Sequence, residues 1–234
     1  MITYLKIFLI VIHTFICSVF GLIFIFLDRS FTLYHILAKI FPGGILLITG
    51  IRVKTTGLEN IDRKSVYVFA SNHSSQLDIT ALQWGVPNRL SMIFKKELAR
   101  IPFFGWQLYL GPYVVIDRKD PQAAMKSLVD AKKVMDKWKI SILVFPEGTR
   151  SKTGEVQSFK RGAFYLAARS GYPIVPITIN GTAKIMPKGS FKLKRGIIHL
   201  HFDKPIPTNN IKTKQDELEL MERVRNIIIE NKKD

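Results

Sequence analysis

The sequence predicts an α/β fold, with a largely parallel sheet flanked by helices, behind an N-terminal membrane-embedded helical segment. Three observations lead to this prediction. Residues 7–27 contain no Lys, Arg, Asp or Glu. From Arg52 onward, short β-branched and aromatic runs alternate with segments of helical periodicity. Several of these runs end directly in polar loops. We therefore expect two parts, a membrane-embedded helical segment over residues 1–50 and an α/β domain over residues 51–234.

The first apolar segment, residues 7–27, is long enough as a helix to cross a hydrocarbon core of about 30 Å. It lacks the short apolar region and the small-residue cleavage site of a signal peptide. A second apolar stretch, residues 31–51, is interrupted by Lys39 and Pro42. It predicts a shorter helix that ends at Pro42 and is too polar to span easily by itself. Two arrangements stay open, a single span or a helical hairpin lodged in one leaflet.

The positive charges around these segments predict the side on which the domain lies. Lys6 precedes the first segment, whereas Lys39, Arg52 and Lys54 all follow it. Since cytoplasmic flanks carry the excess of Lys and Arg, either arrangement leaves the α/β domain in the cytoplasm. The single Cys17 lies in an apolar run, so there is no disulfide framework and no Cys/His zinc cluster.

The α/β domain is expected to contain seven strands and four helices. In such sheets, functional sites collect in the loops at the carboxyl ends of the strands. The predicted strands cover residues 52–57, 65–70, 90–94, 113–117, 140–145, 173–179 and 197–202. The predicted helices cover residues 77–84, 121–138, 161–170 and 213–231.

The chain is strongly basic, with 35 Lys and Arg against 18 acids, a formal charge of +17 and a pI near 10.0. This excess predicts an anionic partner, either nucleic acid or an acidic lipid surface. Nucleic-acid binding would leave the apolar segment unexplained, so we expect membrane phospholipids and no nucleic acid. Residues 184–195 contain five cations and no acid between apolar side chains, which suits an anionic membrane surface. A solvated hairpin explains that segment equally well.

His73 and Asp78 stand five positions apart in "SNHSSQLDIT", directly after a predicted strand. On one regular helix they would point roughly 140° apart. Ser75 and Asp78 fit a capping box, with Ser75 as N-cap and Asp78 at the third helical position. His73 then lies in the strand-to-helix loop, from where Asp78 can reach it. The alternative is that Asp78 only caps the helix and His73 only fills a loop.

Two other loops carry cations beside predicted strands. "PEGTRS", residues 146–151, combines a glycine turn with an arginine whose planar fork suits bidentate phosphate binding. It is not a Walker A loop, which needs two glycines before Lys-Ser/Thr. Lys95 and Lys96 precede an apolar segment, and Arg118 ends another strand. The alternatives are a salt-bridged turn and solvated basic turns.

Taken together, four blocks resemble the motifs of the glycerolipid acyltransferases. In chain length and motif sequence, the resemblance is strongest to the bacterial 1-acylglycerol-3-phosphate acyltransferases. The blocks are "NHSSQLD" (72–78), "KKELARIPFFGW" (95–106) with "GPYVVIDR" (111–118), "FPEGTRS" (145–151) and "IVPITI" (174–179). The resemblance covers roughly residues 50–200. It implies acyl transfer from acyl-CoA or acyl carrier protein to the sn-2 hydroxyl of lysophosphatidic acid, giving phosphatidic acid. It also implies a location at the cytoplasmic face of the bacterial inner membrane.

The resemblance assigns the acceptor site to the third block. It implies that Arg150 contacts the phosphate, with Glu147, Gly148 and Thr149 in the same site. We expect Glu147 to orient the basic groups rather than to touch the anion, and Gly148 to donate a backbone N–H. Lys95, Arg118 and Lys160 are weaker candidates for the same anion or for charge developing on the thioester oxygen. "YVVIDR" has valine and isoleucine where the family often has an aromatic residue, which leaves the acyl-chain preference unreadable.

The residues also fit this chemistry by themselves. A thioester is already activated, so the reaction needs a base for the attacking hydroxyl and no enzyme nucleophile. We expect His73 to be that base and Asp78 to orient it. No cofactor and no metal are expected beyond the thioester co-substrate. The rivals are transfer to glycerol 3-phosphate or another lyso-lipid, a membrane-anchored hydrolase with Ser71, Ser74 or Ser75 as nucleophile, and a membrane-binding module without activity.

Overall fold

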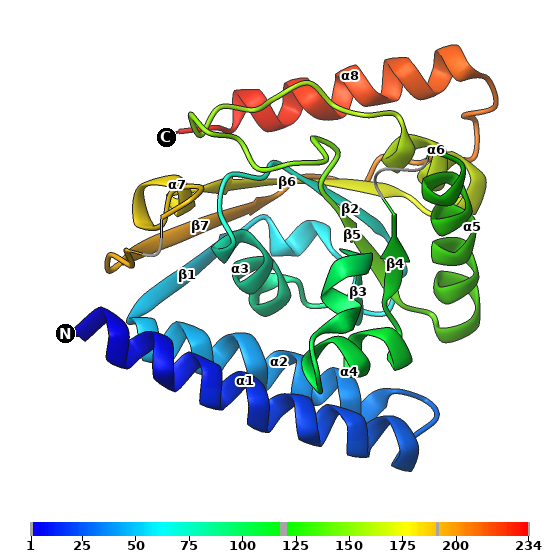
Figure 1. The fold of residues 1–234 in the computed structure, drawn as a ribbon. Coiled ribbons are helices and arrows are strands. Elements are labelled where there is room, and N and C mark those ends of the chain that lie inside the picture. Colours follow the sequence, from blue (N-terminus) through cyan, green and yellow to red (C-terminus); the bar gives the residue numbers. More distant parts are fainter. Residues whose placement is uncertain (1, 118–120, 191, 234) are drawn as a thin grey trace.

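The computed structural model describes residues 2–117, 121–190 and 192–233, and centres on one seven-stranded sheet with helices on both faces (Figure 1). The strand order is β1-β7-β6-β2-β5-β3-β4, and among these strands every neighbouring pair is parallel except β6 and β7. The predicted fold class and all seven predicted strands are therefore confirmed. Their bounds are β1 Ile51–Thr56, β2 Val68–Ser71, β3 Leu90–Lys95, β4 Val114–Ile116, β5 Ser141–Val144, β6 Ile174–Asn180 and β7 Gly196–Phe202.

Four predicted domain helices are present within two residues of their expected bounds. The structure adds short helices that the apolar periodicity did not indicate, because each is only a turn or two long. The helices are α1 Ile2–Leu27, α2 Thr32–Thr49, α3 Leu77–Gly85, α4 Phe104–Leu110, α5 Pro121–Trp138, α6 Gly162–Ser170, α7 Thr182–Ile185 and α8 Lys214–Glu230. Two 3-10 helices lie at η1 Leu58–Asn60 and η2 Lys96–Arg100.

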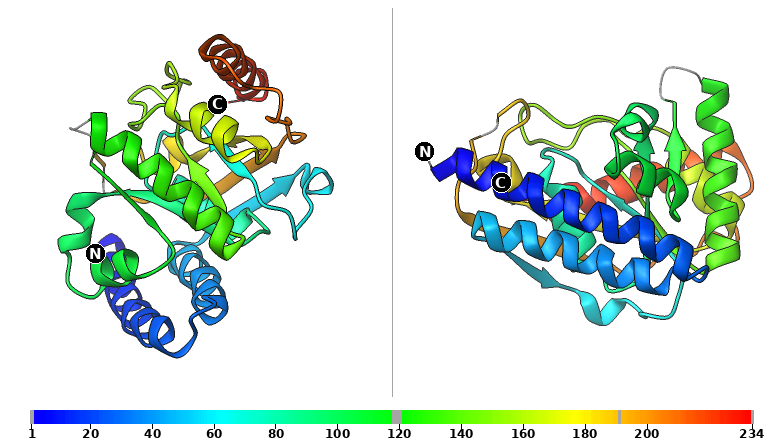
Figure 2. Two further views of the ribbon diagram at one scale, coloured as in Figure 1. Left: turned by 90° about the vertical axis from the view of Figure 1, so that its right-hand side faces the viewer. Right: turned by 60° about the horizontal axis from the view of Figure 1, so that its bottom comes forward.

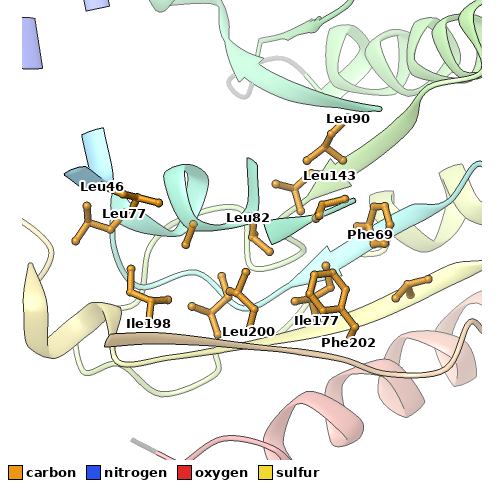
Figure 3. Packing of buried hydrophobic residues seen from close by; sticks show 14 of the residues in the cluster. Leu46, Phe69, Leu77, Leu82, Leu90, Leu143, Ile177, Ile198, Leu200 and Phe202 are labelled. Carbon is orange, nitrogen blue, oxygen red and sulfur yellow. The ribbon is translucent and has the colours of Figure 1, made fainter. Parts of the chain in front are cut away.

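The sheet is buried on both faces, so successive strand residues belong to different cores. Phe69 and Leu143 point to the side of α3, whereas Val68 and Ile142 point to the side of α5, α6 and α8. Figure 3 shows the first of these cores, where Leu82 of α3 packs among strand residues that include Phe69 and Leu200. The packing holds α3, and with it Asp78, against the carboxyl end of β2.

Helices α1 and α2 form an antiparallel hairpin beneath the α3 side of the sheet (Figures 1 and 2). Lys6 near the start of α1 donates to the carbonyl of Thr49 at the end of α2, at 2.7 Å. Among the described residues, Tyr4–Leu27 and Thr32–Thr49 are long and apolar enough to cross a membrane, with mean hydropathies of 2.6 and 1.4. Less than a quarter of either segment is buried, at 17% and 22%, which agrees with membrane association.

The prediction that the second helix ends at Pro42 was wrong, because α2 continues to Thr49. A β-carbon on Gly43 would lie 2.7 Å from the Trp84 ring, and one on Gly44 would meet the His13 ring. The two glycines thus let α2 pack closely against α3 and α1. This packing outweighs the one backbone hydrogen bond that Pro42 cannot make.

Lys39, the charge that seemed to make α2 too polar, does not face outward. Its ammonium donates to the carbonyls of Gln83, Trp84 and Val86 at the carboxyl end of α3. Those carbonyls have no partner within their own helix, so the lysine satisfies them. The hairpin is in this way attached directly to the helix that carries Asp78.

Candidate active site

His73 and Asp78 meet as the loop geometry predicted. His73 lies in the loop between β2 and α3, and its Nδ1 is 2.8 Å from Oδ2 of Asp78 in the first turn of α3. The Asp78 side chain is fully buried, whereas 13% of the His73 side chain is exposed. Because a carboxylate only accepts, Nδ1 carries the hydrogen, and Nε2 is left as the basic nitrogen.

The start of α3 differs slightly from the predicted capping box. The helix begins at Leu77 with Gln76 before it, so Ser75 is not its N-cap. One contact of the box is present, since Oδ2 of Asp78 accepts the Ser75 N–H at 2.8 Å, but the Ser75 hydroxyl accepts the Leu77 N–H at 3.2 Å and not that of Asp78. The same Oδ2 also accepts the Ser74 N–H at 2.7 Å. Asp78 therefore orders the loop and holds the histidine at once.

The three serines of the hydrolase alternative are buried and engaged elsewhere. The Ser75 hydroxyl donates to the carbonyl of Met186 at 2.7 Å, and the Ser74 hydroxyl pairs with that of Thr182 at 3.0 Å. Ser71 is fully buried and donates to the carbonyl of Asn72 at 3.3 Å. Each hydroxyl has a protein partner other than the His73 ring.

Residues of the loop after β5 contact both the backbone and the ring of His73. Oε1 of Glu147 accepts the His73 N–H at 2.8 Å, and the Ser151 N–H donates to the His73 carbonyl at 2.7 Å. The Phe145 ring stacks on the imidazole, with ring centroids 3.9 Å apart and planes inclined by 17°. Both backbone groups and one ring face of His73 are thus set by residues 145–151, so the two loops form one unit.

Glu147 is part of this unit. Its side chain is buried, its second oxygen accepts from Gln157 Nε2 at 2.6 Å, and burial raises the pKa of the carboxyl. Both contacts are with neutral N–H groups, of His73 and Gln157, and they hold the loop in shape. The role expected of Glu147, orienting the basic groups of the acceptor site, stays a prediction.

One pocket of about 920 Å³ brings most of the other candidates together. Its polar end contains His73, Lys95, Gly148, Thr149, Arg150 and Lys160. Arg118 lies outside the described residues. Of the two neighbouring lysines, Lys95 lines the pocket, whereas Lys96 is paired with Asp117 at 3.7 Å.

Sequence reasoning missed one cation of this pocket. Lys188 donates to the carbonyl of Arg150 at 2.5 Å and lines the same polar end. It belongs to the cation-rich segment 184–195, for which the sequence left a membrane surface and a solvated hairpin open, and only the fold brings it to the site. Gly148 has a positive φ of 72°, and a β-carbon there would lie 3.1 Å from Cε and Nζ of Lys160. The glycine therefore permits both the turn and the close approach of Lys160.

The rest of the pocket is mainly apolar, and its far wall comes from the N-terminal hairpin. Cys17 of α1 and Tyr34, Leu37 and Phe41 of α2 line it together with residues of β3 and α4. Tyr34 donates to the side chain of Gln107, which adds a polar contact in this wall. The hairpin thus builds part of the pocket, a contribution that the sequence analysis did not foresee. Within the described part of the chain, no group of three His, Cys, Asp or Glu side chains could hold a metal ion.

Comparison with known proteins gives a match over much of the α/β domain. A sequence model described as Acyltransferase matches residues 52–180, more than half of the chain. The chain belongs to the acyltransferase family. This match contains His73, Asp78 and residues 145–151, whereas Lys188 and the hairpin residues of the pocket lie outside it.

Several relatives within the acyltransferase family are 1-acyl-sn-glycerol-3-phosphate acyltransferases. The 1-acyl-sn-glycerol-3-phosphate acyltransferase of Saccharomyces cerevisiae is 34% identical over 99% of this chain and 78% of that protein. The chloroplastic enzyme LPAT1 of Arabidopsis thaliana is 38% identical over 87% of this chain and 55% of that protein. The chain spans 62% of the Limnanthes douglasii relative, at 34% identity. The crystal structure of PlsC, the LPA acyltransferase of Thermotoga maritima, is 25% identical, has a TM-score of 0.83, and matches 98% of this chain and 92% of that one.

Proposed function

We propose that this acyltransferase-family chain transfers an acyl group from a thioester to the sn-2 hydroxyl of 1-acylglycerol-3-phosphate, giving phosphatidic acid. The observation that carries the proposal is the position of the His73–Asp78 pair. It lies where a cationic pocket end meets a long apolar pocket, and this suits an acceptor that combines a phosphate with acyl chains. The relatives described above, which are named 1-acyl-sn-glycerol-3-phosphate acyltransferases, support the same reaction.

In this mechanism Nε2 of His73 accepts the proton of the acceptor hydroxyl as its oxygen attacks the thioester carbonyl. Asp78 stabilises the imidazolium that forms, because its carboxylate receives Nδ1–H at 2.8 Å. Collapse of the tetrahedral intermediate breaks the carbon–sulfur bond, and the imidazolium returns its proton to the departing sulfur. The bond that Glu147 accepts from the His73 N–H keeps the base in position during both transfers.

The acceptor phosphate is bound at the polar end of the pocket. Arg150 offers a planar fork of donors, and Lys160 and Lys188 add point charges beside the same loop. Lys95 is placed to bind the same anion or to stabilise the developing oxyanion. The apolar part of the pocket receives an acyl chain, and the donor is acyl-CoA or acyl carrier protein.

The two apolar helices hold this site at a membrane. α1 and α2 embed in the phospholipid as a hairpin. The excess of Lys and Arg after α1 supports a domain on the cytoplasmic face, which in a bacterium is that of the inner membrane.

Thiol release from acyl-CoA tests the proposal, measured on the full-length protein in vesicles with and without lysophosphatidic acid. We expect release only with the acceptor, and a loss of about 10²- to 10⁴-fold or more in His73→Ala, since a positioned general base is removed. Release without acceptor would indicate a hydrolase. If the wild-type protein releases no thiol from either acyl-CoA or an acyl carrier protein, the chain is a membrane-binding module.

A further inference from the structure

A second apolar surface lies on the α/β domain itself, in the segment that runs through η2 and α4. Residues 101–116 contain no charged side chain. Trp106 is 47% exposed and Tyr109 64%, which is unusual for aromatic residues of a domain surface in water. The exposed large apolar side chains of this segment are Leu98, Ile101, Phe103, Trp106, Tyr109 and Leu110.

This surface is continuous with the exposed face of α1. The ring of Phe103 packs edge-on against that of Phe15, with centroids 5.1 Å apart. A β-carbon on Gly21 would lie 3.3 Å from Oε1 of Gln107, so α4 packs closely on the middle of α1. Figure 1 shows α4 beside the hairpin, and α1 therefore lies between α2 and α4. The exposed apolar residues of α1 include Phe8, Val11, Phe15, Phe20 and Ile23.

We propose that residues 98–110, here called the α4 segment, are a third membrane-contacting element, and that their partner is the acyl-chain region of the leaflet that receives α1 and α2. This rests on the membrane embedding of the hairpin proposed above. Trp106 and Tyr109 are the residue types that concentrate at the boundary between lipid and water. Arg100 within the segment and Lys96 just before it are both exposed, and their charges can reach anionic headgroups.

The α4 segment also forms part of the pocket. Leu98, Phe104 and Leu108 line the pocket from inside, whereas Phe103, Trp106 and Tyr109 lie on the outer side of the same short stretch. In the proposed arrangement, lipid therefore contacts the outer side of this pocket wall. A protein partner of the α4 segment would have to cover a surface that continues without a break onto α1. The exposed face of α1 is the one proposed above to contact lipid.

The indole of Trp106 is a direct probe of this contact. A variant with Trp84→Phe and Trp138→Phe keeps it as the single tryptophan. In phosphatidylcholine–phosphatidylglycerol vesicles with brominated acyl chains, we expect its fluorescence to fall at least about twofold relative to unbrominated vesicles, as contact with the chains requires. The matched control adds Trp106→Phe and Val129→Trp. Val129 is also 47% exposed but lies on α5, and we expect no such loss there.

The outcomes separate this inference from the proposed function. If the protein sediments with vesicles but Trp106 is quenched no more than the Val129→Trp control, the α4 segment does not contact lipid and the inference is wrong. If the protein does not bind vesicles, the membrane part of the proposed function fails and the inference fails with it. Thiol release is measured separately in both cases.

Activity gives a second readout with exposed residues that do not line the pocket. The pair Tyr109→Asp and Leu110→Asp should slow turnover of vesicle-borne lysophosphatidic acid roughly fivefold or more, because charges are costly beside acyl chains. Turnover of a short-chain, water-soluble acceptor should stay unchanged, as should both activities in Val129→Asp. Equal turnover of the vesicle-borne acceptor by the pair and the wild type would overturn the inference.

Discussion

Asp78→Asn separates catalysis from helix capping, because asparagine is also a good capping residue. In the structure, Oδ2 of Asp78 accepts three N–H groups, from the His73 ring at 2.8 Å and from the backbones of Ser74 and Ser75 at 2.7 and 2.8 Å. An amide oxygen can take the same place and keep all three contacts. What asparagine cannot supply is the negative charge that stabilises a protonated His73.

The stability cost of the change follows from these contacts. Hydrogen bonds to a charged acceptor are worth about 1 kcal/mol more than neutral ones, so three bonds lose ~3 kcal/mol. The new NH2 group also takes the place of Oδ1, a buried atom with no partner among the described residues. Removing a buried charge returns part of this cost, since the carboxylate no longer has to be desolvated. We therefore expect the free energy of unfolding to fall by about 1 to 3 kcal/mol.

The catalytic cost should be much larger. With the orienting charge gone, we expect kcat to fall about 10²- to 10⁴-fold, whereas the Michaelis constants change little. The assay is acceptor-dependent thiol release, with circular dichroism to confirm folding. Ser75→Ala is the control, because it removes the hydroxyl that binds Leu77 and Met186 but leaves the His73–Asp78 bond. It should lower stability by about 1 kcal/mol and leave kcat within about twofold of the wild type.

A folded Asp78→Asn protein with kcat within about threefold of the wild type would refute the reasoning. Asp78 would then be a capping residue only, and another group would have to act as the base or its orienting partner.

Three further predictions concern the acceptor site, the loop support and the hairpin. Arg150→Ala should raise the Michaelis constant for lysophosphatidic acid about 10- to 150-fold, and Arg150→Lys less, with smaller changes for acyl-CoA; equal losses for both substrates would indicate a salt-bridge role. Burial raises the pKa of the Glu147 carboxyl above its usual 4.5, which means that the folded protein binds this proton more tightly than the unfolded chain does. The stability gained in this way is fully present below pH 4.5 and is lost as the pH rises through the raised pKa. Glu147→Gln should remove that part of the pH dependence of unfolding, and identical pH curves would contradict it. Removing residues 1–50 should abolish most turnover of vesicle-borne acceptor, because the hairpin lines the pocket, and full activity of the truncated protein would exclude that role.

Much of the fold could be read from the sequence because the relevant signals are local. The buried strands are short runs such as "SVYVFA" and "ISILVF", and residues of β2 and β5 do reach the cores on both faces of the sheet. The His73–Asp78 contact was also predictable. A five-residue spacing across a strand-to-helix loop depends on a single turn of chain, and the structure closes it at 2.8 Å.

Features that depend on distant segments were not readable. Pro42 predicted a helix end, yet packing of Gly43 and Gly44 against Trp84 and His13 carries α2 onward. The short helix α4 was missed, since Pro102 and Gly105 interrupt its pattern. Gly105 serves packing there, because a β-carbon would lie 2.2 Å from the Leu98 carbonyl oxygen.

The sequence by itself determined the fold class, the apolar N-terminal segment and the contact between His73 and Asp78. Only the tertiary structure decided that Lys188 donates to the Arg150 carbonyl and that Glu147 accepts the His73 N–H. It also decided that residues of the hairpin line the pocket. The physical reason is the range of each effect. Strand patterns, turns and caps act over a few neighbouring residues, whereas a charge finds its partner and a pocket finds its walls only after segments tens of residues apart have packed together.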